Sequence, residues 1–296
     1  MSERKYGHIG RLALIGATLL WGSSFVVLKT TLDSVPTLWI LAIRFTGAAI
    51  LMGLPSIKQL AKIDKRCLAS GVFMGLALYA AYTLQTFGLV YTTPGKNAFL
   101  TATYCVLTPF LWWAFTRKRP DLYNILAALV CITGMALVSL NGDLSVGLGE
   151  GLTMCCGFFY ALHIIFTSKG VARYGVGVLT TIQFATAALL CWISAPISAP
   201  FPDSVPSSAW LSIAYMCVLC TFACYYLQTI GQKYTSPQTS SILLTLESVF
   251  GTLISVAFYG EQLTLRELAG FALIFIAVII SETKLQFLKR PERSPT

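Results

Sequence analysis

Apolar residues occur along this chain in long runs that are separated by short polar segments. A helix needs about 20 consecutive apolar residues to cross the hydrocarbon core of a bilayer. Ten runs reach this length, at roughly residues 9–29, 36–57, 67–91, 96–116, 121–140, 149–169, 177–197, 208–231, 238–259 and 265–284. We therefore expect an all-α integral membrane protein with ten transmembrane helices. The first helix should be retained, because no small-residue cleavage site follows the N-terminus.

The composition argues against a soluble fold. Hydrophobic residues make up 56% of the chain and charged residues 11%, and the mean hydropathy is +0.72. So few polar side chains cannot cover a soluble globule of 32.2 kDa. The formal net charge of +9 does not indicate a nucleic-acid partner, because Lys and Arg lie in short clusters between the apolar runs.

The basic residues predict how the chain is oriented in the membrane. If the N-terminus is cytoplasmic, seventeen Lys and Arg lie at inner ends of the runs and only Lys29, Lys96 and Arg266 at outer ends. By the positive-inside rule, both termini then face the cytoplasm of a multi-pass protein in the cytoplasmic (inner) membrane. The inner residues are Arg4, Lys5, Arg11, Lys58, Lys62, Lys65, Arg66, Arg117, Lys118, Arg119, Lys169, Arg173, Lys233, Lys284, Lys289, Arg290 and Arg293.

The second half of the chain repeats the first. Residues 84–122 and 227–265 align without a gap and are identical at twelve of thirty-nine positions, where roughly three would be expected by chance. Each copy holds five runs, an odd number, so the second copy must enter the membrane upside down. We expect residues 1–142 and 143–296 to be two inverted repeats, joined by an external linker at 143–149 and followed by a short basic tail. This arrangement is typical of transporters that work by alternating access.

The earlier runs align at an offset of 139 residues rather than 143. This offset pairs Trp21 with Tyr160, Ser24 with His163, and Arg44-Phe45 with Gln183-Phe184. Residues paired by either offset are called twins below.

Several of these residues together resemble a known family. They are Trp21-Gly-Ser-Ser-Phe25 with Lys29, Arg44-Phe45, Pro94, the stretch from Pro237 through Glu247 to Gly260-Glu261-Gln-Leu263, and Gly270. The chain resembles the EamA family of the drug/metabolite transporter superfamily over nearly its whole length. The resemblance implies two inverted five-helix EamA repeats and export of amino acids, drugs or other metabolites. One departure is Ser248 after Glu247, where many members have proline.

Glu247 is the most informative candidate for the site. It lies near the middle of its run, and Ser240, Leu244 and Glu247 are the twins of Asn97, Thr101 and Tyr104 in run 96–116. An ionisable group at this depth costs several kcal/mol unless it is paired, hydrated or protonated. It is interpreted as a proton-coupling carboxyl or as the partner of a cationic substrate group. A structural hydrogen bond between helices is the alternative.

Arg44 lies in the outer half of its run. It could bind a substrate carboxylate through two parallel hydrogen bonds. We favour a structural role, in which Arg44 ties a bent helix to exposed carbonyls, because a signature shared among many substrates is weak evidence for one ligand.

The other candidates are aromatic, amide and imidazole groups at twin positions. Tyr82 and Gln85 repeat as Tyr225 and Gln228. Aromatic walls suit a ring or a quaternary ammonium group, and an intramembrane histidine can relay protons or contact substrate. Packing and interhelical hydrogen bonds are the alternatives. The expected substrate-binding set is Trp21, Tyr79, Tyr82, Gln85, Thr101, Tyr104, Tyr160, His163, Tyr225, Gln228 and Glu247.

These observations predict a secondary transporter rather than an enzyme. The chain has two histidines and lacks nucleotide-binding and zinc-protease motifs, and its nine cysteines fall in or beside the runs, so no cofactor and no metal are expected. The expected partners are a small-molecule substrate, the lipid bilayer and protons, for a monomer or weak dimer. The predicted cargo is a small amphipathic metabolite, with amino acids, aromatic ones especially, favoured. The alternative is an organic cation such as a quaternary ammonium compound or drug, bound by Glu247 and an aromatic box.

Overall fold

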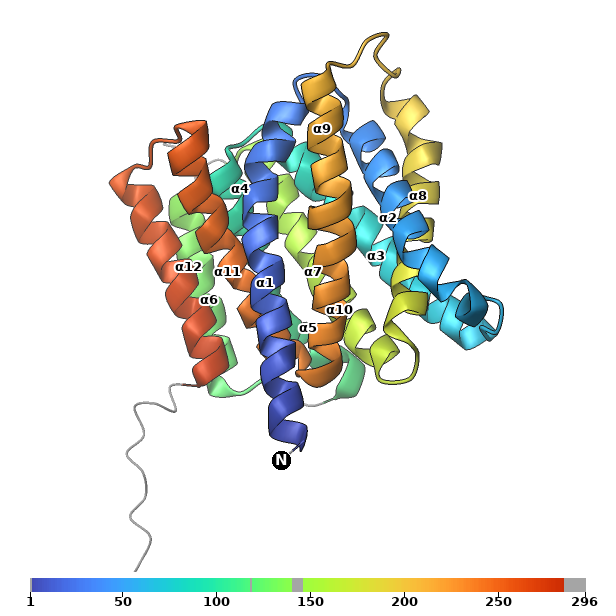
Figure 1. Cartoon of the computed structure of the whole chain (residues 1–296). Helices are drawn as coiled ribbons and strands as arrows, with labels where there is room; N and C mark the ends of the chain where they lie inside the picture. Colours follow the sequence, from blue (N-terminus) through green and yellow to red (C-terminus); the bar gives the residue numbers. More distant parts are fainter. Residues whose placement is uncertain (1, 118, 140–145, 285–296) are drawn as a thin grey trace, which may run out of the picture.

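Helices form almost all of the chain that the computed structural model describes, which is residues 2–117, 119–139 and 146–284 (Figure 1). Residues 140–145, which include the first three residues of the expected linker, lie outside the described residues, as do Lys118 and the tail at 285–296. The elements are α1 (Ser2–Thr31), α2 (Thr37–Leu60), α3 (Lys65–Val90), α4 (Pro94–Thr101), α5 (Tyr104–Thr116), α6 (Leu122–Ser139), α7 (Leu148–Val171), α8 (Val176–Ser198), α9 (Ser207–Tyr215), η1 (Met216–Ala223), α10 (Cys224–Tyr234), α11 (Pro237–Ile254), η2 (Ser255–Tyr259) and α12 (Leu265–Thr283).

A helical segment coincides with each predicted run. Seven segments of the described chain are long and apolar enough to cross a membrane. Shorter apolar helices cover Leu122–Val138 and Leu243–Tyr259, and α12 covers the last run. The all-α prediction is confirmed.

The outside of the bundle is apolar and much of the inside is polar. Leu54, Ile197 and Leu211 are 65%, 83% and 74% exposed, whereas Arg44 and His163 are each 1% exposed. Water would not favour this distribution. It is the one expected when lipid surrounds the helices and the polar groups face one another inside.

Two of the predicted runs are interrupted in ways that matter for the site. Run 96–116 breaks between α4 and α5. In this break the hydroxyl of Thr103 donates to Leu100 O at 2.8 Å. Run 208–231 contains the π-helix η1, in which Thr221 Oγ1 donates to Met216 O, five residues earlier, at 2.8 Å. π-Helical turns are rare and occur frequently at functional sites.

The helices of the two halves pack against each other in pairs. α2 packs on α8, α6 on α12, α3 on α7, and α1 on both α10 and α11. The beginning of α1 and the end of α12 lie at the same end of the bundle (Figure 1). The sequence-distant halves are therefore interleaved rather than separate.

Small residues permit the closest of these approaches. Gly71 and Gly75 on α3 face α8, and a Cβ atom on Gly75 would lie 2.5 Å from Thr186 Cβ and 2.7 Å from Gln183 O. Such contacts are too short for any side chain. The Gly-x-x-x-Gly motif thus joins two helices of the same chain.

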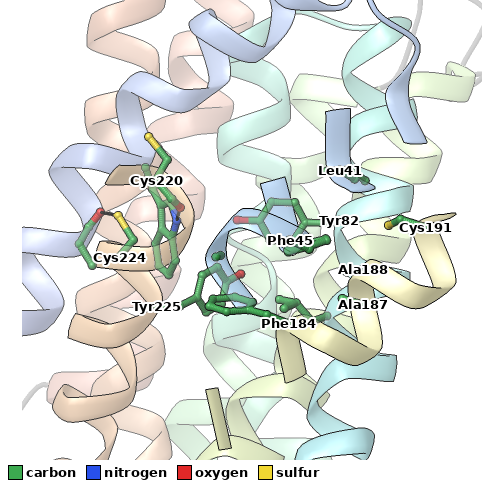
Figure 2. Close-up of a cluster of buried hydrophobic side chains, with 14 of the residues drawn as sticks. Leu41, Phe45, Tyr82, Phe184, Ala187, Ala188, Cys191, Cys220, Cys224 and Tyr225 are labelled. Atoms are coloured by element: carbon green, nitrogen blue, oxygen red, sulfur yellow. Dashed lines mark hydrogen bonds between the residues drawn. The ribbon is translucent and has the colours of Figure 1, made fainter. Parts of the chain in front are cut away.

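An aromatic cluster fills the centre of the bundle. Phe45, Tyr82, Phe184 and Tyr225 come from α2, α3, α8 and α10 and gather where these helices meet (Figure 2). Phe45 stacks on Phe184 at 6.1 Å between ring centroids and meets Tyr82 edge-on at 5.3 Å. This cluster forms one side of the candidate site.

Candidate functional site

A small central cavity lies inside the bundle, bordered by α1, α2, α3, α5, α7, α10 and α11. Its volume is about 40 Å³, which is room for only a few water molecules. Most of the residues expected from the sequence line this central cavity. They are Trp21, Arg44, Tyr82, Gln85, Tyr104, Tyr160, Tyr225, Gln228 and Glu247.

Glu247 faces the central cavity from α11 and is 7% exposed. Tyr104 donates its hydroxyl hydrogen to Glu247 Oε1 at 3.3 Å. The break between α4 and α5 places Tyr104 in the first turn of α5, opposite Glu247. No Lys, Arg or His of the described residues forms an ion pair with this carboxyl group. Its remaining hydrogen-bonding capacity is directed toward the central cavity.

Arg44 reaches the same cavity from α2. Its Nε donates to Thr221 Oγ1 in η1 at 3.1 Å, and its guanidinium lies 5.3 Å from the ring centroid of Tyr82. Its Nη2 is buried and has no hydrogen-bond partner in the described part of the chain. Arg44 and Glu247 do not pair with each other, although both line one cavity.

Two glutamines with different surroundings complete the polar part of the lining. Both polar atoms of the Gln85 side chain on α3 have partners, because its Oε1 accepts from Tyr160 Oη at 2.7 Å and its Nε2 donates to Thr101 Oγ1 at 3.0 Å. Its twin Gln228 on α10 is 3% exposed, and its Oε1 has no partner among the described residues. Gln228 therefore offers a free acceptor.

The walls between these polar groups are aromatic. Trp21 meets Tyr225 edge-on at 5.0 Å, and its indole N–H donates to Cys220 O in η1 at 2.7 Å. Tyr160 lies 5.8 Å from Tyr82 and 6.2 Å from Tyr104 between ring centroids. These edge-to-face contacts hold the rings at fixed angles around the cavity.

Three of the expected residues lie outside the lining of the central cavity. Tyr79 donates to Ser194 Oγ at 3.0 Å, which links α3 to α8. Thr101 accepts the hydrogen bond from Gln85, one layer behind the cavity wall. His163 hydrogen-bonds Gln183 Oε1 at 2.8 Å and packs edge-on against Tyr225 at 5.7 Å. Their predicted contacts with substrate would require the helices to move.

Sequence reasoning missed Thr221. Its hydroxyl lies in the π-helix η1 and accepts from Arg44 Nε, and no residue pattern in run 208–231 signals a π-helical turn. Sequence reasoning also left out the apolar part of the lining, which includes Phe25, Leu28 and Ile164.

Comparison of the sequence with known proteins identifies the family. The profile of the EamA-like transporter family matches residues 8–140 and 147–283, which is most of the chain. The chain belongs to the EamA-like transporter family. It is a multi-pass membrane protein and a transporter, as its resemblance to the family predicts.

Relatives with the same organisation occur in distant organisms. An uncharacterized transporter of Archaeoglobus fulgidus is 32% identical over 282 residues, which cover 94% of this chain and 86% of that protein. The uncharacterized inner membrane transporter YedA of Escherichia coli K12 is 22% identical, covering 96% and 94%. A solved crystal structure superposes with a TM-score of 0.72 at 15% identity, over 95% of this chain and 99% of that one. That structure shares the fold of this EamA-like transporter.

Proposed function

We propose that this EamA-like transporter is a secondary-active exporter of small amphipathic metabolites, foremost amino acids including aromatic ones. One observation carries the proposal. Arg44 and Glu247, both buried, line the same cavity without pairing with each other. A zwitterion supplies the missing partner of each, because its carboxylate suits the guanidinium and its ammonium suits the carboxylate.

The unpartnered atoms support this orientation of the cargo. Arg44 Nη2 is a buried donor without an acceptor, and Gln228 Oε1 is a buried acceptor without a donor. A buried donor or acceptor that lacks a hydrogen bond costs about 1–3 kcal/mol, and a charged group costs more. A bound amino acid removes both costs, and the rings of Trp21, Tyr82 and Tyr160 can pack around its side chain.

A second candidate cargo is an organic cation. The observation that favours it is Glu247 surrounded by aromatic rings, the combination that binds quaternary ammonium groups. The Arg44 guanidinium argues against it, because a cation in the same cavity would face an unpaired positive charge.

We further propose that residues 1–142 and 143–296 are inverted repeats that together form ten transmembrane helices with both termini in the cytoplasm. Twin residues from the two halves meet at the centre of the bundle. Phe45 stacks on Phe184, Tyr82 lies 6.1 Å from Tyr225, and Tyr104 hydrogen-bonds Glu247. Residues related by a two-fold axis touch only near that axis, which supports an axis through the site.

The proposed symmetry and the small volume of the cavity support transport by alternating access. About 40 Å³ cannot hold an amino acid. The helices must separate to admit one, and two equivalent halves can separate at either membrane face. We propose the cytoplasmic membrane as the location, a monomer or weak dimer as the working unit, and protons as the coupling ions, with Glu247 as the group that takes up the proton.

Binding to the purified protein in detergent tests the proposal. We expect phenylalanine to raise the melting temperature and phenethylamine, which lacks the carboxylate, to do so much less. Arg44→Gln should weaken phenylalanine binding at least about thirtyfold, because it leaves the substrate carboxylate buried without its partner. The matched control is Arg66→Gln, which removes the same group from an exposed position on α3.

The remaining variants separate binding from folding and from coupling. Arg44→Lys keeps the positive charge and should therefore retain partial binding. If Arg44→Lys binds and Arg44→Gln does not, although both variants are folded, the loss of binding is due to the missing charge. Glu247→Gln should abolish the pH dependence of transport in proteoliposomes. The amino acid proposal is wrong if only quaternary amines stabilise the protein and if Arg44→Gln leaves their binding intact.

A further inference from the structure

A second and larger hollow lies near the ends of α5, α7 and α10. These helix ends lie toward the end of the bundle at which α1 begins (Figure 1). Its volume is about 690 Å³, within the range of pockets that bind small molecules. We call it the vestibule. The residues that the argument uses are Trp112, Ser168, Lys169, Arg173, Gln232 and Lys233.

The vestibule is positively charged. Lys169, Arg173 and Lys233 line it, and no acidic residue of the described chain does. None of the three forms an ion pair with a carboxylate of the described residues. The ammonium of Lys169 lies over aromatic rings instead, 5.6 Å from the centroid of Trp112 and 4.7 Å from that of Phe115. The positive-inside rule explains why basic residues occur at this end, but it does not explain why three of them surround a hollow.

The vestibule adjoins the central cavity. Ile164 and Gln228 line the central cavity, and Ser168 and Gln232, each one turn further along α7 and α10, line the vestibule. Gln232 Nε2 spans the two helices, donating to Ile164 O at 3.3 Å and to Ser168 Oγ at 3.5 Å. Its Oε1 is buried and has no partner among the described residues. Gln232 therefore contacts residues that line both spaces.

The opposite end of the bundle is joined by two groups of hydrogen bonds. The Glu261 carboxylate accepts from the hydroxyls of Thr93 and Ser255 and from Gly95 N. Lys29 Nζ donates to Leu89 O, Val90 O and Thr92 O at 2.7–3.0 Å. These contacts hold the opposite end together, and we therefore take the route to the central cavity to run through the vestibule.

We infer that the vestibule is an intake site that binds the carboxylate of the cargo between Lys169, Arg173 and Lys233 before the cargo passes Gln232. This rests on the proposed export of amino acids, with the vestibule on the cytoplasmic side. The positive charge attracts carboxylates and repels organic cations, so the vestibule selects for the same class of cargo as Arg44 does.

The test uses the full-length protein in detergent and the fluorescence of Trp112, which lies beneath Lys169. We would titrate propionate, propylammonium and inorganic phosphate at constant ionic strength, and subtract the signal of Trp112→Phe. Propionate should change the fluorescence and propylammonium should not. The triple variant K169Q/R173Q/K233Q should lower the affinity for propionate about tenfold, because each screened contact contributes a few-fold. The matched control is K58Q/K62Q/K65Q, which removes three exposed positive charges elsewhere at the same end.

Transport provides the second readout. In proteoliposomes, the vestibule triple variant should raise the KM for phenylalanine offered from the vestibule side about tenfold, with kcat in that direction unchanged. An unchanged KM together with no response to propionate overturns the intake site. A response to phosphate that propionate does not share also overturns it, and would indicate a site for phosphate or a lipid headgroup.

The failure of this inference is distinguishable from failure of the proposed function. If phenylalanine binds through Arg44 but propionate leaves Trp112 unchanged, the amino acid proposal stands and the intake site does not. If propionate binds in the vestibule but phenylalanine fails to stabilise the protein, the anion site stands and the amino acid cargo is wrong.

Discussion

Replacing Glu261 with alanine removes the acceptor of three hydrogen bonds at one end of the bundle. Its carboxylate accepts from Thr93 Oγ1, Ser255 Oγ and Gly95 N, the last at 2.9 Å. These donors belong to the beginning of α4 and to η2, so the carboxylate joins helices from both halves of the chain. It also lies at the N-terminus of α4, where a negative charge is favoured.

The contacts give the expected magnitude. A hydrogen bond to a charged group contributes about 1.5–3 kcal/mol when it is buried. Glu261 is only partly buried, so water replaces part of what is lost, and we expect Glu261→Ala to lower the free energy of unfolding by about 2–4 kcal/mol. Glu150 is the matched control at the same end, because its carboxylate accepts one hydroxyl, from Thr92 at 2.9 Å. Glu150→Ala should cost about 1 kcal/mol.

Unfolding in mixed micelles, followed by circular dichroism, measures both variants. Gly95→Ala provides an independent arm, since its added Cβ would lie 2.7 Å from Glu261 Oε2 and displace the carboxylate. In the double variant with Glu261→Ala, the Gly95→Ala change should lower the free energy of unfolding by less than it does alone, because both changes break the same contacts. If Glu261→Ala destabilises the protein no more than Glu150→Ala does, the reasoning about the three-donor contact is wrong.

Two further predictions concern other helix contacts. Gly75→Ala should destabilise the protein by about 1–3 kcal/mol, because the new methyl group would lie 2.5 Å from Thr186 Cβ. The control Gly151→Ala should not destabilise it, because its methyl group meets nothing within 4 Å. Thermal unfolding in detergent measures both variants. Partial burial raises the pKa of the Asp121 carboxyl group. Its hydrogen bonds, above all the one from Lys284 Nζ, nevertheless bring that pKa below its usual value. This ion pair therefore stabilises the fold above about pH 4 and loses that contribution as pH falls. Asp121→Asn should flatten this acid-side dependence in unfolding curves, and an unchanged curve would contradict the role of the pair.

The sequence was sufficient for the family, the helical architecture and most of the site lining. Length and apolarity of a run are local properties, and a bilayer requires each spanning segment to satisfy its own backbone hydrogen bonds. The same requirement makes a central ionisable residue such as Glu247 conspicuous. The two-copy pattern added the twin positions, and Tyr82 with Tyr225 and Tyr104 with Glu247 were found in contact.

Only the tertiary structure decided which partners these residues have. Arg44 donates to Thr221 Oγ1, which lies in a π-helical turn that no residue pattern in run 208–231 signals. The same holds for the vestibule, whose basic residues come from separate segments and surround one hollow only after folding. Membrane insertion selects each helix by its own composition, whereas a binding site depends on the relative positions of residues from many helices. The sequence by itself determined that this chain spans a membrane as a duplicated helical protein, and the packing of the two halves decided which charges remain unpaired.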